Sequence, residues 1–376
     1  MMEHLQNFRP TQALINLDAV YANVANLRQH LHSEVHIMAV IKANAYGHGD
    51  IQVAETALKA GATMLAVATP EEALHVRKHI SNVPILILGA VPVSFAPYAA
   101  KYDITLTIFS TEWLERIAES AATFEKTLTV HLKVDSGMGR IGVRTMEQLR
   151  DVYEAAMSTQ NVLVDGIFTH FATADEEDPT FYEQQLQTFK TFVESLPVKP
   201  RIVHAANTAA SLVKQNVQFD AVRFGISMYG LAPSDYVAEH LPYALQPALS
   251  LVTELVHVKQ LHAGDSVGYG ATYVAQGDEW IGTLPIGYAD GMIRGLANQE
   301  VLVGGERAPI VGRICMDQVM IKLPKQFSVG EPVVLIGKQG HEEIFIQEWA
   351  DRLQTIVYEV PCMLTERIPR VFVTEK

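Results

Sequence analysis

Eight short apolar runs alternate with longer stretches of helical pattern over residues 35–225, and this alternation constrains the fold more than any other feature. The runs are continuously hydrophobic and rich in β-branched residues, which is typical of strands buried on both faces. Eight strands in strand–helix alternation predict a (β/α)8 barrel of the TIM type, which usually takes about 250 residues. An open, doubly wound α/β sheet is the main alternative. The predicted strands are 35–41, 63–68, 85–89, 104–109, 128–134, 162–169, 201–204 and 221–224, and the clearest helices are 51–60, 70–78, 111–121, 146–157 and 179–194.

The pattern changes after about residue 240, where short strands are separated by Gly, Asp and Pro turns without regular helices between them. We therefore predict a barrel domain over residues 1–242 and a β-rich C-terminal domain over residues 243–376. Residues 12–17 read as a strand that could belong to either domain, and Asp18 is a plausible N-cap for the first helix. The predicted C-terminal strands are 249–261, 264–268, 279–284, 301–303, 308–311, 319–323 and 332–335.

Composition excludes several classes of protein. With 29 Lys and Arg against 42 Asp and Glu, the net charge is −13, which argues against nucleic acid or an anionic membrane as partner. No apolar stretch is long enough to span a bilayer, and the N-terminus has no signal-peptide pattern. Only two cysteines occur, Cys315 and Cys362, so we expect a cytoplasmic protein without a disulfide framework. No metal site is expected.

Lys42 directly follows the first predicted strand of the barrel. Active sites of barrels gather at the C-terminal ends of their strands, so Lys42 is expected at the mouth. Partial burial lowers the pKa of a lysine amine and makes it a nucleophile suited to Schiff-base chemistry. The alternative is a lysine that merely reaches solvent at the rim of the barrel.

Other polar residues follow later strands of the barrel. Lys133 lies inside a strand, where an unpaired ammonium needs an anionic partner or a modification, and Arg140 follows in the next loop. His170 is either a site residue or a hydrogen-bonded histidine of the mouth without a catalytic role. Loops after the seventh and eighth strands commonly bind phosphate in this fold, and the donors available there are Thr208 and the N–H groups of Gly225 and Ile226. Arg223, at the end of the last strand, must find an anion or an aromatic nitrogen, or face water.

In the C-terminal domain, Tyr269 lies between two glycines, which exposes its ring and hydroxyl. Polar inserts at 285–291 and 312–318 are turn-like. A loop tyrosine is more often a packing residue than a base, so residue chemistry alone predicts a barrel enzyme with a lysine and a phosphate site, without a defined reaction.

Four segments resemble motifs of the alanine racemases and occur in the same order. They are AVIKANAYGHG at 39–49, KVDSGMGR at 133–140, RFGI at 223–226 and ICMD at 314–317. Several long motifs in one order are much harder to produce by chance than a single short pattern. The resemblance extends over essentially the whole chain.

This resemblance implies a pyridoxal-phosphate-dependent racemase that interconverts L- and D-alanine and supplies D-alanine for cell-wall peptidoglycan. Lys42 would bind the cofactor covalently and act as one base, and Tyr269, from the partner subunit of a homodimer, would be the base on the opposite face. Lys133 is similar to a family lysine that is carbamylated, and the resulting anion would pair with Arg140. The remaining roles are cofactor binding for Tyr46, His170, Thr208, Arg223, Gly225, Ile226 and Tyr358, and substrate binding for Arg140 and Met316.

Arg223 would face the pyridine nitrogen of the cofactor. A guanidinium does not give up its proton, so the nitrogen would stay unprotonated and the cofactor would be a weaker electron sink, which suppresses transamination. A chain of Tyr269, His170 and Arg223 would assist the tyrosine as a base. Barrel-type pyridoxal-phosphate decarboxylases, which set a carboxylate against this nitrogen, are the closest alternative. A non-catalytic pyridoxal-phosphate-binding protein and a cofactor-free Schiff-base aldolase are two others.

Overall fold

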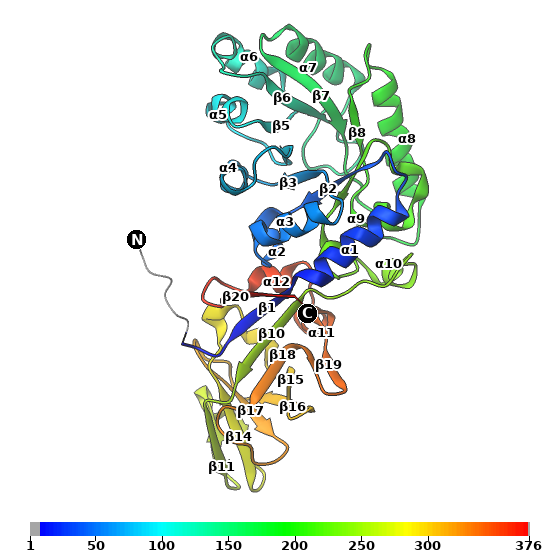
Figure 1. The fold of residues 1–376 in the computed structure, drawn as a ribbon. Coiled ribbons are helices and arrows are strands. Elements are labelled where there is room, and N and C mark those ends of the chain that lie inside the picture. Colours follow the sequence, from blue (N-terminus) through cyan, green and yellow to red (C-terminus); the bar gives the residue numbers. More distant parts are fainter. Residues whose placement is uncertain (1–7, 375–376) are drawn as a thin grey trace. The chain divides into compact units, whose positions relative to one another are not determined.

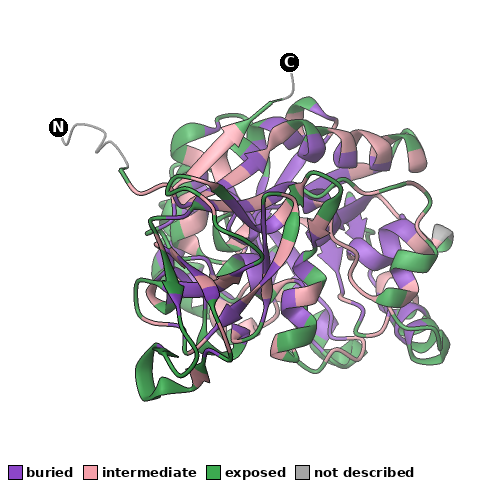
Figure 2. Ribbon diagram, turned by 90° about the horizontal axis from the view of Figure 1, so that it is seen from below, coloured by how far each residue is buried: buried purple, intermediate pink, exposed green. Residues whose placement is uncertain are grey.

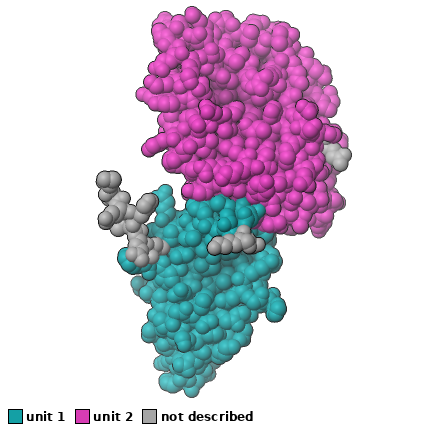
Figure 3. Space-filling model, in the orientation of Figure 1, with its two compact units in different colours: residues 1–18, 247–376 teal, residues 19–246 magenta. Residues whose placement is uncertain are grey.

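The computed structural model describes residues 8–374, which form the two compact units coloured separately in Figure 3. One unit consists of Ala19–Gln246, and the other combines Pro247–Lys376 with the N-terminal residues up to Asp18. Figure 2 shows that buried residues, in purple, lie largely on strands, whereas exposed residues, in green, lie on loops and on the outer faces of helices. Among the described residues, no helix is both long and apolar enough to cross a bilayer.

Eight parallel strands of Ala19–Gln246 close into a barrel, in the order of the chain (Figure 1). They are β2 (His36–Val40), β3 (Met64–Val67), β4 (Ile85–Ile87), β5 (Ile104–Ile108), β6 (Leu128–Lys133), β7 (Val162–Phe168), β8 (Ile202–His204) and β9 (Ala221–Phe224). The predicted (β/α)8 barrel is confirmed. The open-sheet alternative is wrong because β2 pairs with β9 as well as with β3. Every residue of β3, β4 and β9 is buried, which explains their uninterrupted hydrophobic runs.

The helices between these strands begin at good capping residues. Thr69 and Thr145 each form a reciprocal capping box, and Ser110 accepts a hydrogen bond from the Trp113 N–H. The first helix begins at Leu17, so Asp18 lies in its first turn rather than at the N-cap, where its charge still favours the helix dipole. The helices are α1 (Leu17–His30), α3 (Asp50–Lys59), α4 (Pro70–His79), α5 (Ala96–Lys101), α6 (Thr111–Ala121), α7 (Met146–Ser158), α8 (Thr180–Glu194), α9 (Thr208–Val213) and α10 (Asp235–Glu239).

The other unit is built on one large sheet with the order β11-β14-β17-β16-β15-β18-β10-β1-β20. The N-terminal strand β1 belongs to this sheet, where it pairs antiparallel to β10 and parallel to β20. In addition, β19 pairs with β18, and β12 and β13 form a separate two-stranded sheet. The strands of the unit are β1 (Gln12–Asn16), β10 (Leu249–Glu254), β11 (His257–Leu261), β12 (Ser266–Val267), β13 (Tyr273–Val274), β14 (Glu279–Leu284), β15 (Glu300–Val303), β16 (Glu306–Val311), β17 (Val319–Leu323), β18 (Pro332–Gln339), β19 (Glu342–Ile344) and β20 (Arg370–Val373).

Two features of this unit correct the sequence-based expectation. The predicted strand 249–261 is two strands, β10 and β11, with a turn between them. The expectation of no regular helices is wrong near the C-terminus, where α11 (Ile346–Leu353) and α12 (Glu359–Met363) lie between β19 and β20. Helix α11 buries Trp349 completely, so it contributes to the core of the unit.

Candidate active site

Lys42 lies at the start of a left-handed turn at the end of β2. The turn, α2 (Lys42–Tyr46), directly follows Ile41, and residues 43–46 all have φ between 52° and 53°. None of these four residues is glycine, and a left-handed conformation costs about 1–2 kcal/mol for each L-residue. Such strain persists only where the surroundings hold it, and it concentrates at functional sites.

Side chains of neighbouring elements hold this turn in place. The carboxylate of Glu72, in α4, accepts hydrogen bonds from the N–H groups of Ala43 and Ala68, each at 2.7 Å. Asn44 accepts a hydrogen bond from the Asp50 N–H at 3.0 Å, which joins the turn to α3. Glu72 therefore ties the residue after Lys42 to the end of β3.

Tyr46, Thr208 and Gly225 converge at one place in the barrel. The Gly225 N–H donates to Thr208 Oγ1 at 2.9 Å, and both residues are buried. A methyl group at Gly225 would lie 2.9 Å from the Tyr46 hydroxyl and 3.4 Å from Thr208 Oγ1. Ile226 follows directly and is completely buried. The structure thus brings together four of the predicted phosphate-binding residues, and the missing side chain of Gly225 leaves room for a ligand oxygen.

Arg223 is buried in the barrel, only 3% exposed, and its guanidinium is surrounded by neutral acceptors. Nη1 donates to His204 Nδ1 at 2.8 Å, and Nη2 donates to the carbonyl oxygens of Thr169 and Ala205, both at 2.8 Å. His170 Nδ1 lies 3.3 Å from Nη2, so the predicted contact between His170 and Arg223 is present. Nε has no acceptor among residues 8–374, which leaves its hydrogen as the donor for a ligand.

Burial sets the charge states in this part of the barrel. It lowers the pKa of Arg223 to about 9, so the guanidinium stays protonated at neutral pH. Burial, reinforced by the charge of Arg223, holds the pKa of His170 and of His204 well below the usual value, so both imidazoles are neutral.

His204 and a further histidine, His131, were missed by the sequence analysis because both lie inside apolar strands. His131 Nδ1 is 3.0 Å from His204 Nε2, and both rings are buried. A histidine within a strand that is otherwise hydrophobic was the available signal.

Lys133 is buried near two other cations, as its place in a strand suggested. Burial, with Arg223 and Arg140 close enough to contribute, lowers the pKa of its ammonium well below the ordinary value. Its Nζ donates to the Val134 carbonyl at 3.2 Å and lies over the Phe168 ring. Arg140 is exposed on the loop after β6, which Asp135 shapes by accepting hydrogen bonds from two loop N–H groups.

Tyr269 and Met316 lie together in the other unit, where they line one hollow with Cys315, Asp317 and Gln318. Tyr269 is 71% exposed and Met316 is 53% exposed. The glycines on both sides of Tyr269 have φ of 73° and 74°, a conformation that favours glycine, and this turn presents the phenol to solvent.

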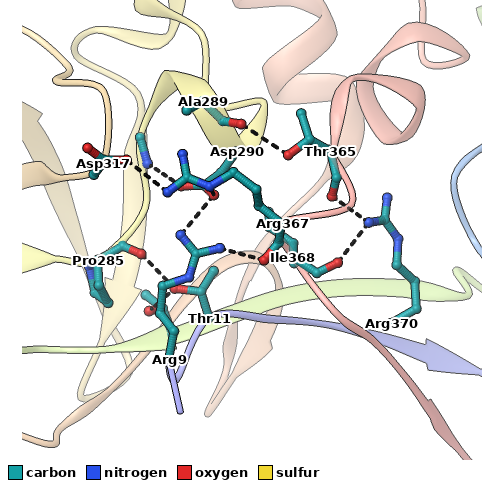
Figure 4. A network of polar contacts seen from close by, with 12 residues as sticks. Arg9, Thr11, Pro285, Ala289, Asp290, Asp317, Thr365, Arg367, Ile368 and Arg370 are labelled. Carbon is teal, nitrogen blue, oxygen red and sulfur yellow. Dashed lines mark hydrogen bonds and ion pairs between the residues drawn. The ribbon is translucent and has the colours of Figure 1, made fainter. Parts of the chain in front are cut away.

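A network of polar contacts surrounds Asp290, which lies in the polar insert at 285–291 (Figure 4). The completely buried Asp290 accepts a hydrogen bond from Arg9 at 2.8 Å and lies 3.3 Å from Arg367, which also contacts Asp317 at 2.8 Å. The Ala289 N–H donates to the Met316 carbonyl at 3.0 Å. Two arginines on one buried carboxylate thus fix the backbone next to Met316. Tyr358, partly buried, comes just before α12.

Family models and individual relatives match the chain along almost its full length. The model of the alanine racemase N-terminal domain matches residues 15–233, and that of the C-terminal domain matches residues 248–372. An alanine racemase of Anoxybacillus flavithermus is 50% identical over 371 residues, which cover 98% of this chain and 96% of the relative.

The chain belongs to the alanine racemase family.

Solved structures agree with this family. The crystal structure of alanine racemase from Bacillus anthracis with bound L-Ala-P has a TM-score of 0.93 and 44% identity, covering 98% of this chain and 96% of that one. A histidine racemase from Leuconostoc mesenteroides has a TM-score of 0.92 and 33% identity, covering 99% and 100%. The predicted family and fold are confirmed, and the chain is an amino-acid racemase by membership. Because the histidine racemase shares this scaffold, fold alone does not select the side chain of the substrate.

Proposed function

We propose that this protein interconverts L- and D-alanine with pyridoxal phosphate bound at Lys42. The observation that carries the proposal is the convergence of Tyr46, Thr208 and the bare Gly225 on one space, at the far end of the turn that begins with Lys42. Alanine as the substrate is supported by a relative named alanine racemase that is 50% identical to this chain.

The residues present fit this cofactor. The hydroxyl groups of Tyr46 and Thr208, next to a glycine without a side chain, can donate to a phosphate, and Lys42 supplies the amine. Tyr358 would complete the phosphate site. When bound, pyridoxal phosphate supplies an electron sink for the charge left at the α-carbon of the substrate.

Arg223 is suited to the pyridine nitrogen. Its Nη groups are committed to acceptors inside the barrel, so Nε is the donor that remains. A guanidinium holds its proton, and the nitrogen opposite would remain unprotonated. This choice of residue argues against the decarboxylase alternative, which uses a carboxylate at the same place.

Racemisation requires that a proton leave one face of the α-carbon and return to the other. Lys42 Nζ would take or return it on one face, and Tyr269 Oη would do so on the opposite face. The exposure of Tyr269 fits a residue that serves a neighbouring subunit, so we propose a homodimer in which each site takes Tyr269 and Met316 from the partner.

Arg140 and the Met316 N–H would bind the substrate carboxylate. Lys133 would carry a carbamate: burial lowers the pKa of its ammonium and so favours the neutral amine, which is the form that adds to carbon dioxide with loss of a proton. The resulting anion would offset the positive charges of Arg140 and Arg223. We further propose that the enzyme works in the cytoplasm and that its D-alanine serves cell-wall peptidoglycan.

Two variants test the proposed bases. Lys42→Ala should abolish the visible absorbance of the bound cofactor and all racemisation, whereas Lys59→Ala, in α3, should leave both intact. Tyr269→Ala should retain the cofactor but lose most turnover of L-alanine. Tyr98→Ala, at an exposed position on α5, is the matched control. Racemisation by Lys42→Ala, or undiminished L-alanine turnover by Tyr269→Ala, would refute the corresponding assignment.

A further inference from the structure

A buried chain of side chains runs from Arg223 into the barrel. Arg223 Nη1 contacts His204 Nδ1 at 2.8 Å, and His204 Nε2 contacts His131 Nδ1 at 3.0 Å. His131 Nε2 has no hydrogen-bond partner among the described residues, but Asp165 Oδ2 faces it at 3.9 Å. Asp165 in turn accepts two hydrogen bonds from Arg201, at 2.8 and 2.6 Å. Hydrogen bonds therefore connect the guanidinium to His131, and the Asp165 carboxylate, two strands away from Arg223, faces His131 from beyond hydrogen-bond distance.

The backbone of β7 is shaped around His131. The pairing of β6 with β7 shifts from Val130↔Val164 to His131↔Gly166, so Asp165 is the extra residue of a β-bulge. A methyl group at Gly166 would lie 2.6 Å from both Cε1 and Nδ1 of the His131 ring. The bulge places the carboxylate beside His131, and the glycine makes room for the ring. Two separate features of one strand thus accommodate this side chain.

In this series of side chains, each member donates its hydrogen to the next, starting from Arg223. A guanidinium can only donate, so His204 Nδ1 must accept and His204 must carry its hydrogen on Nε2. His131 Nδ1 must then accept from His204, and His131 also carries its hydrogen on Nε2, directed toward Asp165. Burial lowers the pKa of both histidines, which keeps the rings neutral as this order requires. His131 and Arg201 hold the pKa of Asp165 well below its usual range, so it is a carboxylate.

We propose that His131 and Asp165 are positioning residues that act on Arg223 through His204. They fix the tautomer of His204, which holds Nη1 of Arg223 and thereby aims Nε at the ligand. A His204 that lost its acceptor in His131 could turn its hydrogen elsewhere, and Arg223 would lose a fixed partner. This inference rests on the proposed function, because the group toward which Nε is aimed is the cofactor's pyridine nitrogen.

The first test reads the tautomers in the full-length protein, with and without added pyridoxal phosphate. Two-bond nitrogen–proton NMR spectra of protein labelled with ¹⁵N-histidine distinguish the two neutral tautomers and the imidazolium, and the His131→Gln and His204→Gln spectra assign the signals. We expect hydrogen on Nε2 in both His131 and His204 at neutral pH. Hydrogen on Nδ1 of either ring, or a charged imidazolium, would overturn the proposed order of donors and acceptors from Arg223 to His131. This reading does not depend on catalysis, so it stands apart from a failure of the proposed function.

The second test measures the ratio of transamination to racemisation. A purely structural defect lowers both reactions together and leaves their ratio unchanged, whereas a displaced Arg223 changes the ratio. His131→Leu should raise it about 2- to 10-fold, the effect of one neutral hydrogen bond. His131→Gln, which can still accept and donate, should restore the wild-type ratio. An unchanged ratio in folded His131→Leu, or an equal change in His131→Gln, would overturn the proposal.

Asp165→Asn is a third variant: the side chain is 13% exposed, and its amide oxygen can still accept one of the two hydrogen bonds from Arg201. Removing the charge should raise the ratio in the same direction as His131→Leu. If Asp165→Asn had the wild-type ratio of transamination to racemisation, Asp165 would have no part in positioning Arg223.

Discussion

Replacing Gly225 by alanine should weaken the binding of pyridoxal phosphate without unfolding the barrel. The new methyl group would lie 2.9 Å from the Tyr46 hydroxyl, closer than an ordinary carbon–oxygen contact, and 3.4 Å from Thr208 Oγ1. It would therefore occupy the space in which a phosphate oxygen meets the tyrosine.

The size of the effect follows from the hydrogen bond that is lost. A hydrogen bond to a charged group contributes about 1.5–3 kcal/mol, so losing the one from Tyr46 should weaken affinity about 10- to 150-fold. Thr208→Val should cause a loss of similar size because it removes the hydroxyl, whereas Thr208→Ser retains it and should bind nearly as wild type.

The assay is a fluorescence titration of the cofactor-depleted protein with pyridoxal phosphate, repeated with inorganic phosphate as competitor. Gly277→Ala is the control, since nothing lies within 4 Å of a methyl group there. If Gly225→Ala bound the cofactor as tightly as Gly277→Ala, the phosphate would lie elsewhere and the assignment of this cradle would be wrong.

Three further outcomes are expected. Glu72→Ala should lower kcat and cofactor affinity because it releases the strained turn at Lys42, whereas Glu72→Gln keeps an acceptor oxygen and should have a much smaller effect. Equal effects of the two variants would show that the hydrogen bonds of Glu72 do not hold the turn. Arg223→Glu should raise transamination relative to racemisation, and an unchanged partition would undermine its role at the pyridine nitrogen. Because His131 and His204 are neutral in the folded state but take up protons in the unfolded state below pH 6.5, unfolding free energy should fall as pH drops from 7.5 to 5.5, by up to about 1.4 kcal/mol for each histidine. Urea unfolding at the two pH values measures this, and a stability that rises toward acid would contradict the burial of neutral rings.

The barrel was predictable because most of its strands are buried on both faces and therefore appear as largely apolar runs. The turn at Lys42 was not, since the residues of KANAY have no glycine to mark a left-handed backbone, and the neighbours that impose it are distant in the sequence. Helices α11 and α12 were missed because they are short and lie among strands.

The site was predictable in part. Lys42 follows a strand, so barrel geometry alone predicted it at the mouth. The structure brings Thr208 and Gly225 together with Tyr46, which only the family resemblance had named. His131 and His204 depend on contacts between strands that no local pattern encodes. The role of Tyr269 still rests on family resemblance, because spacing along the chain says nothing about a partner subunit.

Chiral analysis of the products formed from each pure enantiomer of alanine tests the central claim most directly. With pyridoxal phosphate present, L-alanine and D-alanine should both proceed to the same equal mixture, and removal of the cofactor should stop both reactions. Pyruvate or a decarboxylated amine as main product, or inversion that continues without the cofactor, would contradict a pyridoxal-phosphate-dependent racemase built on Lys42 and Tyr269.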